Sequence, residues 1–159
     1  MEHLTQISID RKDWAAEHKR TYLESGGARG HIVDLRDING HGFTTCLVLK
    51  TIGRKSGEAH LAPLIYADTA GEVVIVGSRG GAPKHPAWVH KIRAAKDVDF
   101  QIATEAFRGS WREPEGAERD KVWQFMVEFF PPYASYQAAT DREIPLVMLT
   151  ARERLERLW

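Results

Sequence analysis

Short strand-like segments follow one another along this chain, most of them bounded by turns that contain glycine, and this pattern limits the available folds. Parallel strands need crossover connections of a dozen or more residues, usually helices, and the sequence shows no regular alternation of strands and helices. Seven strand-like segments are predicted, at residues 31–36, 44–51, 59–67, 72–78, 99–103, 106–112 and 144–150. The expected fold class is therefore α+β, mainly β: a barrel-like sheet of six or seven mostly antiparallel strands, wrapped by three or four helices.

Three stretches have apolar residues at the three- and four-residue spacing of helices. The expected buried faces are Trp14, Ala15, His18 and Tyr22 in residues 10–25; Trp88, Val89, Ile92 and Ala95 after Pro86; and Val122, Phe125, Met126, Phe129 and Phe130 in residues 114–130. Pro131 and Pro132 end the last helix. The β-branched run at residues 73–76 is expected to be buried on both faces, and residues 152–159 to form a charged tail.

Length and composition exclude several classes of protein. A chain of 159 residues corresponds to one domain, expected here at residues 1–159 with an N-terminal helical extension at about residues 1–28. The 22 Lys and Arg residues balance the 22 Asp and Glu residues, so the basic excess of a nucleic-acid-binding protein is missing. The single cysteine, Cys46, excludes an intramolecular disulfide and any multi-cysteine metal site, and its apolar neighbours are typical of an inert core residue.

The N-terminal region indicates where the protein works. It lacks the apolar core of a signal peptide, and no apolar stretch approaches the roughly 20 residues that span a bilayer, so we expect a cytoplasmic protein. Lys19 and Arg20 lie near Trp14 and Tyr22, a combination that also suits a membrane surface. Acidic residues in the same helix favour packing on the barrel instead, and membrane association through this helix stays the alternative.

Two loops combine glycine with positive charge. The first, at residues 53–57, contains Arg54, Lys55 and Ser56, and it lacks the spacing of a nucleotide-binding P-loop. The second, at residues 77–84, follows the buried strand and precedes a helix, an arrangement that directs backbone N–H groups toward anions. Two such loops can hold one polyanionic ligand between them. The alternative for each is an ordinary solvated turn.

An aromatic cluster follows the two prolines, with Tyr133 and Tyr136 three residues apart. We expect a short irregular segment that projects these rings, either as the wall of a site for a planar substrate or as a plug at one end of the barrel. His85 and His90 lack the spacing of a helical metal pair, so no metal site is expected.

Five segments taken in order resemble the deazaflavin (F420)-dependent nitroreductase and quinone reductase family. They are Thr-Ile-Gly-Arg-Lys-Ser-Gly at 51–57, Ala-Pro-Leu-Ile-Tyr at 62–66, Gly-Ser-Arg-Gly-Gly-Ala-Pro-Lys-His-Pro-Ala-Trp at 77–88, Tyr-Ala-Ser-Tyr-Gln at 133–137 and Thr-Asp-Arg-Glu-Ile-Pro at 140–145. The resemblance implies a split β-barrel related to FMN-binding oxidoreductases and an actinobacterial origin. It also implies reduced coenzyme F420 as the hydride donor to a small electron-poor acceptor: a quinone, a nitroaromatic compound or a conjugated enone.

The resemblance also implies roles for individual residues. Arg54, Lys55 and Ser56 would hold the phosphate and glutamate tail of the coenzyme; His60, Leu61, Ala62, Pro63, Leu64 and Ile65 would lie along the deazaflavin ring; Val76, Gly77, Ser78 and Arg79 would complete the phosphate side; and Ala87, Trp88, Val89, His90 and Lys91 would wall the pocket. Tyr133 would face the reactive centre with Tyr136 and Ser78, and these three are the expected catalytic residues. Departures from the family pattern are Arg79, where lysine is usual, Val89, where an aromatic residue is frequent, and Phe130, where some members have tyrosine.

Two other functions stay open at this point. One is an FMN-dependent reductase on the same barrel, and the other is a non-catalytic carrier of a planar ligand. The oligomeric state and the physiological acceptor are not predicted.

Overall fold

The computed structural model describes residues 11–36 and 42–159. Its strands are β1 (Ile32–Asp34), β2 (Phe43–Ile52), β3 (Ala59–Thr69), β4 (Glu72–Val76), β5 (Val98–Ile102), β6 (Glu105–Arg112) and β7 (Leu146–Leu155); its helices are α2 (Arg11–Glu24), the 3-10 turn η1 (Arg79–Gly81), α3 (Ala87–Arg93), α4 (Gly116–Phe129) and α5 (Pro132–Ala138). The first ten residues of the predicted N-terminal extension lie outside the described residues.

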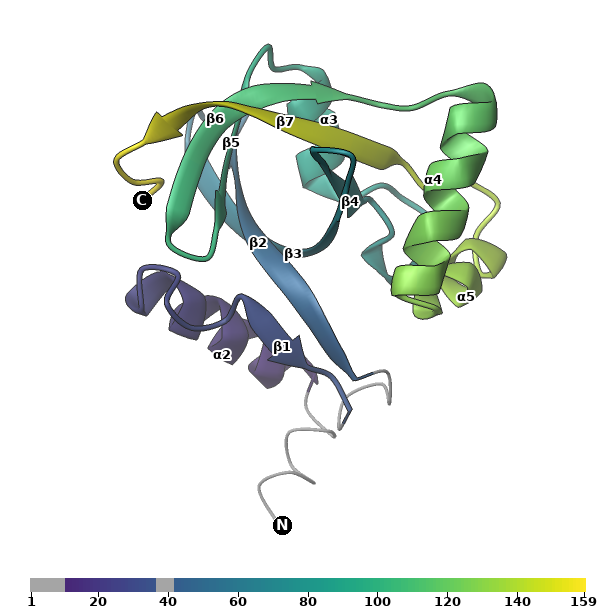
Figure 1. Cartoon of the computed structure of the whole chain (residues 1–159), viewed down its shortest axis with the longest axis horizontal. Coiled ribbons are helices and arrows are strands. Elements are labelled where there is room, and N and C mark those ends of the chain that lie inside the picture. Colours follow the sequence, from purple (N-terminus) through teal and green to yellow (C-terminus); the bar gives the residue numbers. More distant parts are fainter. Residues whose placement is uncertain (1–10, 37–41) are drawn as a thin grey trace.

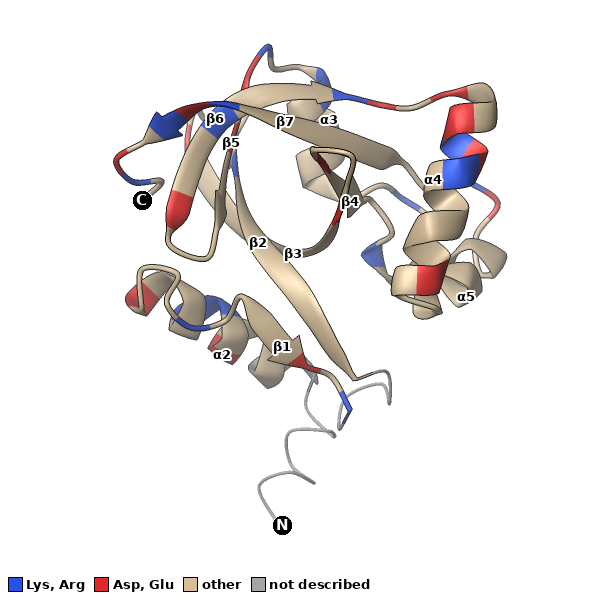
Figure 2. Cartoon of the chain, viewed as in Figure 1, with Lys and Arg blue, Asp and Glu red and all other residues tan. Residues whose placement is uncertain are grey.

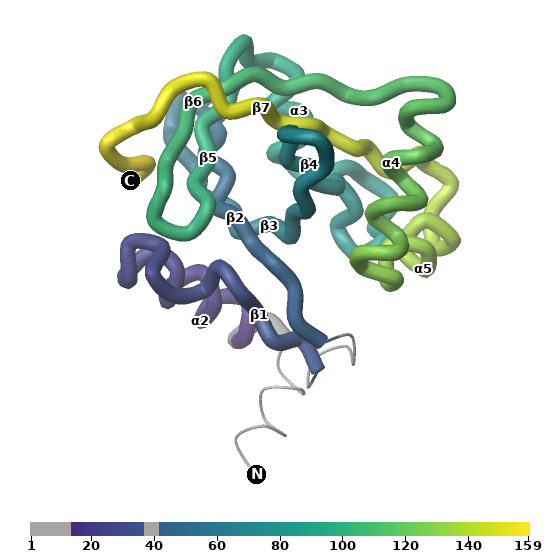
Figure 3. Tube along the Cα trace, viewed as in Figure 1, coloured from purple at the N-terminus to yellow at the C-terminus, as the bar shows by residue number. Residues whose placement is uncertain are grey.

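Six strands close into an antiparallel barrel in the order β2-β3-β4-β7-β6-β5 (Figures 1 and 3). The ring closes because β2 also pairs with β5, from Leu47 opposite Ile102 to Lys50 opposite Asp99. The seventh strand, β1, pairs only with the beginning of β2, beside the barrel. The expected fold, a split barrel of six or seven strands with three or four helices around it, is confirmed for the described part of the chain.

The barrel strands contribute to two buried clusters, because successive side chains along a strand point to opposite faces. On one face, residues such as Leu47, Leu49 and Ile75 pack with Trp88, Val89 and Ile92 of α3. On the other face, Val48, Val74 and Val76 belong to a cluster with side chains of three helices. These are Tyr22 of α2, Val122 and Met126 of α4, and Tyr133 of α5. The prediction that residues 73–76 are buried on both faces is therefore confirmed.

Helix α2 packs against the barrel through Tyr22, which is fully buried. The Tyr22 hydroxyl donates to the backbone oxygen of Cys46 at 3.0 Å and accepts from the backbone N–H of Ala103 at 2.9 Å. Gly27 follows the helix with φ near +91°, and a Cβ there would lie 1.7 Å from the carbonyl oxygen of Ala103. The predicted face is thus confirmed for Trp14, His18 and Tyr22, whereas Ala15, which was expected on the same face, is exposed. No helix in the described part of the chain is long and apolar enough to cross a membrane.

Two predictions near the C-terminus were wrong in part. The last strand begins at Leu146 and continues to Leu155, so the predicted charged tail begins as strand. Its charged side chains face solvent and approach neighbours on β6, as Arg154 does Glu105 at 3.6 Å. A run of charged residues is therefore compatible with a strand whose side chains are exposed to solvent. The aromatic segment after the two prolines is also regular, because Pro132 suits the first turn of a helix and begins α5.

Two predicted core residues were wrong as well. Phe125 is 37 % exposed, because α4 turns only the stripe of Val122 and Met126, with Trp123 partly buried, toward the barrel. Ala95 lies beyond the end of α3 and is exposed. Figure 2 shows acidic and basic residues interspersed along α4, as expected of a solvated face.

Candidate active site

A cavity of about 660 Å³, here called the main pocket, is lined by five segments of the chain: α2, β1 with the start of β2, β3, the β4–α3 segment, and α5 together with Phe130, which follows α4. The main pocket brings together many residues predicted for the site: Pro63, Leu64, Ile65, Val76, Ser78, Arg79, Trp88, Tyr133 and Tyr136. Its lining is mostly apolar, with a few hydroxyl groups and cations, which is typical of a site for a planar organic ligand.

The main pocket reaches the barrel where β3 is open on one side. β3 pairs with β2 through residues 59–65 but with β4 only through residues 66–69, so residues 59–65 have no strand on their second side in the described structure. Pro63 lacks an N–H group and is therefore tolerated at such an edge. Pro63, Leu64 and Ile65 give this side of the pocket an apolar wall.

The loop after β4 has an unusual backbone conformation. Arg79 has φ near +44°, a region that disfavours residues with a Cβ, and Gly80 and Gly81 follow it at +64° and +83°. A Cβ at Gly81 would lie 2.7 Å from the backbone oxygen of Tyr136, so glycine lets the loop contact α5. Ser78 is buried and Arg79 is exposed, and both line the main pocket.

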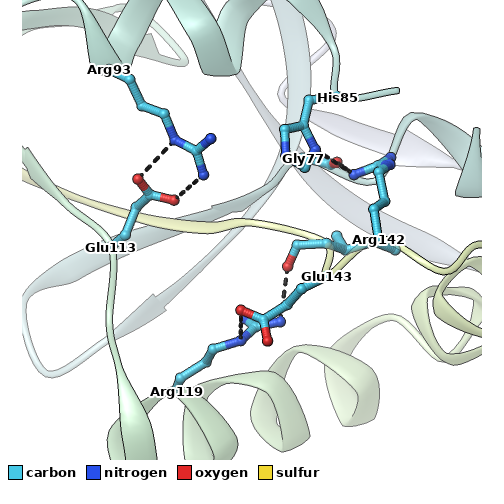
Figure 4. Close-up of polar contacts among 8 residues, drawn as sticks. Gly77, His85, Arg93, Glu113, Arg119, Arg142 and Glu143 are labelled. Atoms are coloured by element: carbon cyan, nitrogen blue, oxygen red, sulfur yellow. Dashed lines mark hydrogen bonds and ion pairs between the residues drawn. The ribbon is translucent and has the colours of Figure 1, made fainter. Parts of the chain in front are cut away.

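Arg142 holds this loop in place (Figure 4). Its guanidinium donates to the backbone oxygens of Ala82 at 2.8 Å, Gly77 at 3.1 Å and Ser78 at 2.7 Å. It also donates to Nδ1 of His85 at 2.8 Å. A guanidinium only donates, so this His85 nitrogen carries no proton. Burial, with Arg142 and other neighbouring charges, lowers the pKa of His85 and favours the neutral ring.

Three aromatic rings form the α5 side of the main pocket. The ring centroid of Tyr133 is 4.9 Å from that of Phe130 and 6.2 Å from that of Tyr136, both in edge-to-face arrangements. Tyr133 is only 3 % exposed, and its hydroxyl has no hydrogen-bond partner in the described part of the chain. Burial raises the pKa of Tyr133 far above its ordinary value, so the phenol stays protonated at neutral pH and can donate.

The remaining wall of the main pocket comes from residues that the sequence did not predict. Trp14, His18 and Lys19 contribute it from α2, and Val33, Leu35, Thr44 and Cys46 from β1, the residues after it and β2. The rings of Trp14 and His18 stack with centroids 5.5 Å apart, and His18 Nε2 lies 2.9 Å from the backbone oxygen of Gly30. Cys46 is buried, as predicted, and burial raises the pKa of its thiol to about 12.

The basic loop between β2 and β3 lies outside the main pocket. Arg54 lines a second cavity of about 420 Å³ with Lys50, Lys91 and Arg108. Lys55 and Ser56 are exposed, and Ser56 Oγ accepts from the backbone N–H of Glu58 at 3.1 Å, which closes the turn. The loop ends where β3 begins, at Ala59. Pro63 of the main pocket lies four residues further along β3, or about 13 Å at the rise of a strand.

The other predicted residues line neither cavity. They are Lys55, Ser56, His60, Leu61, Ala62, Gly77, Ala87, Val89 and His90. Val89 is fully buried in the core, and its side chain would lie 2.8 Å from a Cβ at Gly77. Within the described residues, no cluster of three or more His, Cys, Asp or Glu side chains could hold a metal ion.

Comparison with known proteins decides the family. The model of the F420H(2)-dependent quinone reductase family matches residues 14–151. This chain belongs to that family. An F420H(2)-dependent quinone reductase of Mycobacterium tuberculosis is 30 % identical over 138 residues, which cover 85 % of this chain and 88 % of the relative. The actinobacterial origin that the family resemblance implies is consistent with this mycobacterial relative.

Solved structures similar to this chain are consistent with its membership of the F420H(2)-dependent quinone reductase family. One described as an F420-H2 dependent reductase (FDR-A) is 38 % identical, with a TM-score of 0.60, over 65 % of this chain and 92 % of its own. Another, described as a domain-swapped dimer, is 34 % identical, with a TM-score of 0.62, over 88 % of this chain and 99 % of its own. Family membership makes the chain an oxidoreductase with F420 as its coenzyme, and nothing in the comparisons favours FMN or a non-catalytic carrier.

The residues present fit the coenzyme of this family. A planar ring needs an apolar slot, which Pro63, Leu64, Ile65 and Trp88 supply. An anionic tail needs cations at a distance from that slot, and Arg79 lies at the main pocket while Arg54 and Lys91 line the second cavity. When bound, F420H2 supplies the hydride.

We expect Arg79→Gly to separate coenzyme binding from stability in this quinone reductase. Glycine adopts positive φ without strain, so thermal stability should stay equal or rise by a few degrees. The variant loses a cation at the pocket, so F420 affinity should fall roughly tenfold. Thermal melting and F420 titration measure the two effects. Unchanged F420 affinity would show that Arg79 does not contact the coenzyme.

Proposed function

We propose that the main pocket is where this enzyme transfers a hydride from F420H2 to a quinone. The observation that carries the proposal is the convergence in one cavity of an apolar β3 edge, a basic loop and the hydroxyl side chains of Ser78, Tyr133 and Tyr136. The overall reaction is balanced: F420H2 and a quinone give F420 and a hydroquinone, with two electrons and two hydrogens transferred.

The β3 edge and Trp88 orient the donor in this proposal, and Arg79, Arg54 and Lys55 hold its anionic groups. A hydride that reaches a quinone builds negative charge on a quinone oxygen. Hydroxyl groups that donate to this oxygen stabilise the transition state more than the bound quinone. Tyr133 is the strongest candidate, because it is the most buried of the three residues and water therefore competes least for its hydroxyl.

Parallel titration with F420, FMN and FAD tests the coenzyme part of the proposal. We expect F420 to bind most tightly, with quenching of Trp88 fluorescence, because this indole lines the main pocket. Tighter binding of FMN than of F420 would contradict the proposal.

Arg54→Ala and Lys55→Ala are each expected to weaken F420 binding about tenfold, because a charge-assisted hydrogen bond contributes roughly 1.5–3 kcal/mol. Both losses should shrink at high salt, since the Debye length falls from about 10 Å at 0.1 M to 3 Å at 1 M. Lys121→Ala on α4 removes an exposed lysine elsewhere and is the matched control. Affinity that matches this control in both variants would remove the loop from the coenzyme site.

A further inference from the structure

Thr44 has a hydroxyl with no partner, although the residue is only 4 % exposed. Among side-chain nitrogen and oxygen atoms that are themselves fully buried in the described residues, Oγ1 of Thr44 alone lacks a hydrogen bond. Buried polar groups are normally paired, because water is given up when they are buried. An unpaired hydroxyl therefore persists at a cost in stability, which a ligand can remove.

The position of Thr44 indicates which ligand. It lies on β2 opposite Val33 of β1, and both residues line the main pocket. Cys46, two residues along the same face, also lines the pocket, and it is close enough to Tyr133 to affect the pKa of that phenol. Two residues of a strand span roughly 7 Å. Thr44 therefore lies two residues along β2 from Cys46, which marks the Tyr133 end of the pocket. Its side of the pocket is the wall formed with α2 and β1.

We propose that Thr44 is a specificity-determining residue whose hydroxyl hydrogen-bonds the quinone oxygen that lies away from Tyr133. A 1,4-quinone such as menadione has two carbonyl oxygens on opposite sides of one ring, so donors at both ends strengthen its binding. Rotation about the Cα–Cβ bond of Thr44 exchanges its methyl and hydroxyl groups at the pocket wall. A hydroxyl also suits both redox states of the ligand, because it donates to the quinone and accepts from the hydroquinone.

The neighbouring residue provides a matched control. Thr45 faces the other side of β2, and its hydroxyl donates to the backbone oxygen of Tyr66 at 2.7 Å. Thr44→Val and Thr45→Val make the same near-isosteric change at adjacent positions. Only the second removes a hydrogen bond that exists in the protein without ligand.

The test measures thermal melting of the protein without coenzyme, and steady-state turnover of F420H2 with menadione. We expect Thr44→Val to melt at the same or a higher temperature than wild type, while its KM for menadione rises on the order of tenfold and its KM for F420H2 is unchanged. Thr44→Ser should restore the KM for menadione. Thr45→Val should melt at a lower temperature with an unchanged KM.

This inference rests on the proposed function, and the experiment separates the two. A wild-type protein that fails to oxidise F420H2 with menadione overturns both. Wild-type turnover together with an unchanged menadione KM in Thr44→Val overturns the role of Thr44 alone. A lower melting temperature in Thr44→Val also contradicts it, because the hydroxyl would then have a structural partner. If Thr44→Val does not fold, the comparison of Thr44→Ala with Thr44→Ser gives the same KM contrast.

Discussion

Tyr133→Phe is expected to lower kcat about 100-fold while F420 affinity stays at the wild-type value. The substitution keeps the ring that packs on Phe130 and Tyr136 and deletes only the hydroxyl. Loss of one well-placed donor to a developing oxyanion lowers kcat by about 10²–10³. Because the hydroxyl has no partner in the described residues, its removal should not lower thermal stability.

Steady-state kinetics with F420H2 and one quinone measure this effect, and thermal melting provides the check on folding. Tyr136→Phe is the natural comparison, since Tyr136 lines the same pocket but is only partly buried. Its effect on kcat should be smaller. A Tyr133→Phe enzyme with wild-type kcat would mean that the ring packs in the pocket without taking part in the reaction.

Arg142→Met is expected to weaken F420 binding more than tenfold and to lower the melting temperature by about 10 °C. Methionine keeps much of the aliphatic length but removes the guanidinium donor from the backbone oxygens of Gly77, Ser78 and Ala82, of which that of Ser78 keeps the backbone N–H of Gly81 as a donor. A hydrogen bond from a charged donor contributes roughly 1.5–3 kcal/mol to stability. Because the three bonds share one side chain, we expect their loss to lower the free energy of unfolding by about 3 kcal/mol. In a domain of this size, each kcal/mol lost from the free energy of unfolding lowers the melting temperature by several degrees.

Arg119→Met is the matched control for Arg142→Met. Arg119 also reaches the segment before β7, where it pairs with Glu143 at 3.0 Å and donates to the backbone oxygen of Ile144 at 2.9 Å (Figure 4). It does not contact the β4–α3 loop, so its loss should affect stability but not F420 affinity. If Arg142→Met folds and binds F420 as wild type does, Arg142 has no role in positioning the loop. Should it fail to fold, Arg142→Lys, which keeps the charge but not the planar group, replaces it in the titration.

Much of the fold was predictable because its signals are local. Glycine-containing turns and two-residue periodicity located all seven strands within a few residues, and the β-branched run at 73–76 indicated burial on both faces. The last strand was cut short because charged residues such as Arg154 suggest solvent exposure, and they are indeed exposed while still in the sheet. Phe125 was misplaced because helical spacing cannot show how narrow the contact stripe of α4 is.

The site was predictable only where a motif marked it. The glycine-rich loop and the tyrosines after two prolines are such motifs, and they meet in one cavity. The α2 wall was missed because the spacing of Trp14 and His18 predicts a buried face without saying what it covers. Arg142 was part of a recognised segment, but nothing local indicates that its side chain reaches carbonyl groups some 60 positions earlier in the chain. The orphan hydroxyl of Thr44 depends on three-dimensional packing and leaves no trace in the sequence.

Anaerobic turnover of F420H2 with menadione measures the proposed hydride transfer itself, and it is followed by the absorbance of oxidised F420 and by chromatography of the menadiol formed. We expect F420 and menadiol to appear in equal amounts, at a rate proportional to enzyme, and we expect the enzyme not to accelerate the spontaneous reduction of menadione by reduced FMN. Enzyme-dependent acceleration with reduced FMN but not with F420H2, or no enzyme-dependent oxidation of F420H2, would contradict hydride transfer from F420H2 by this enzyme.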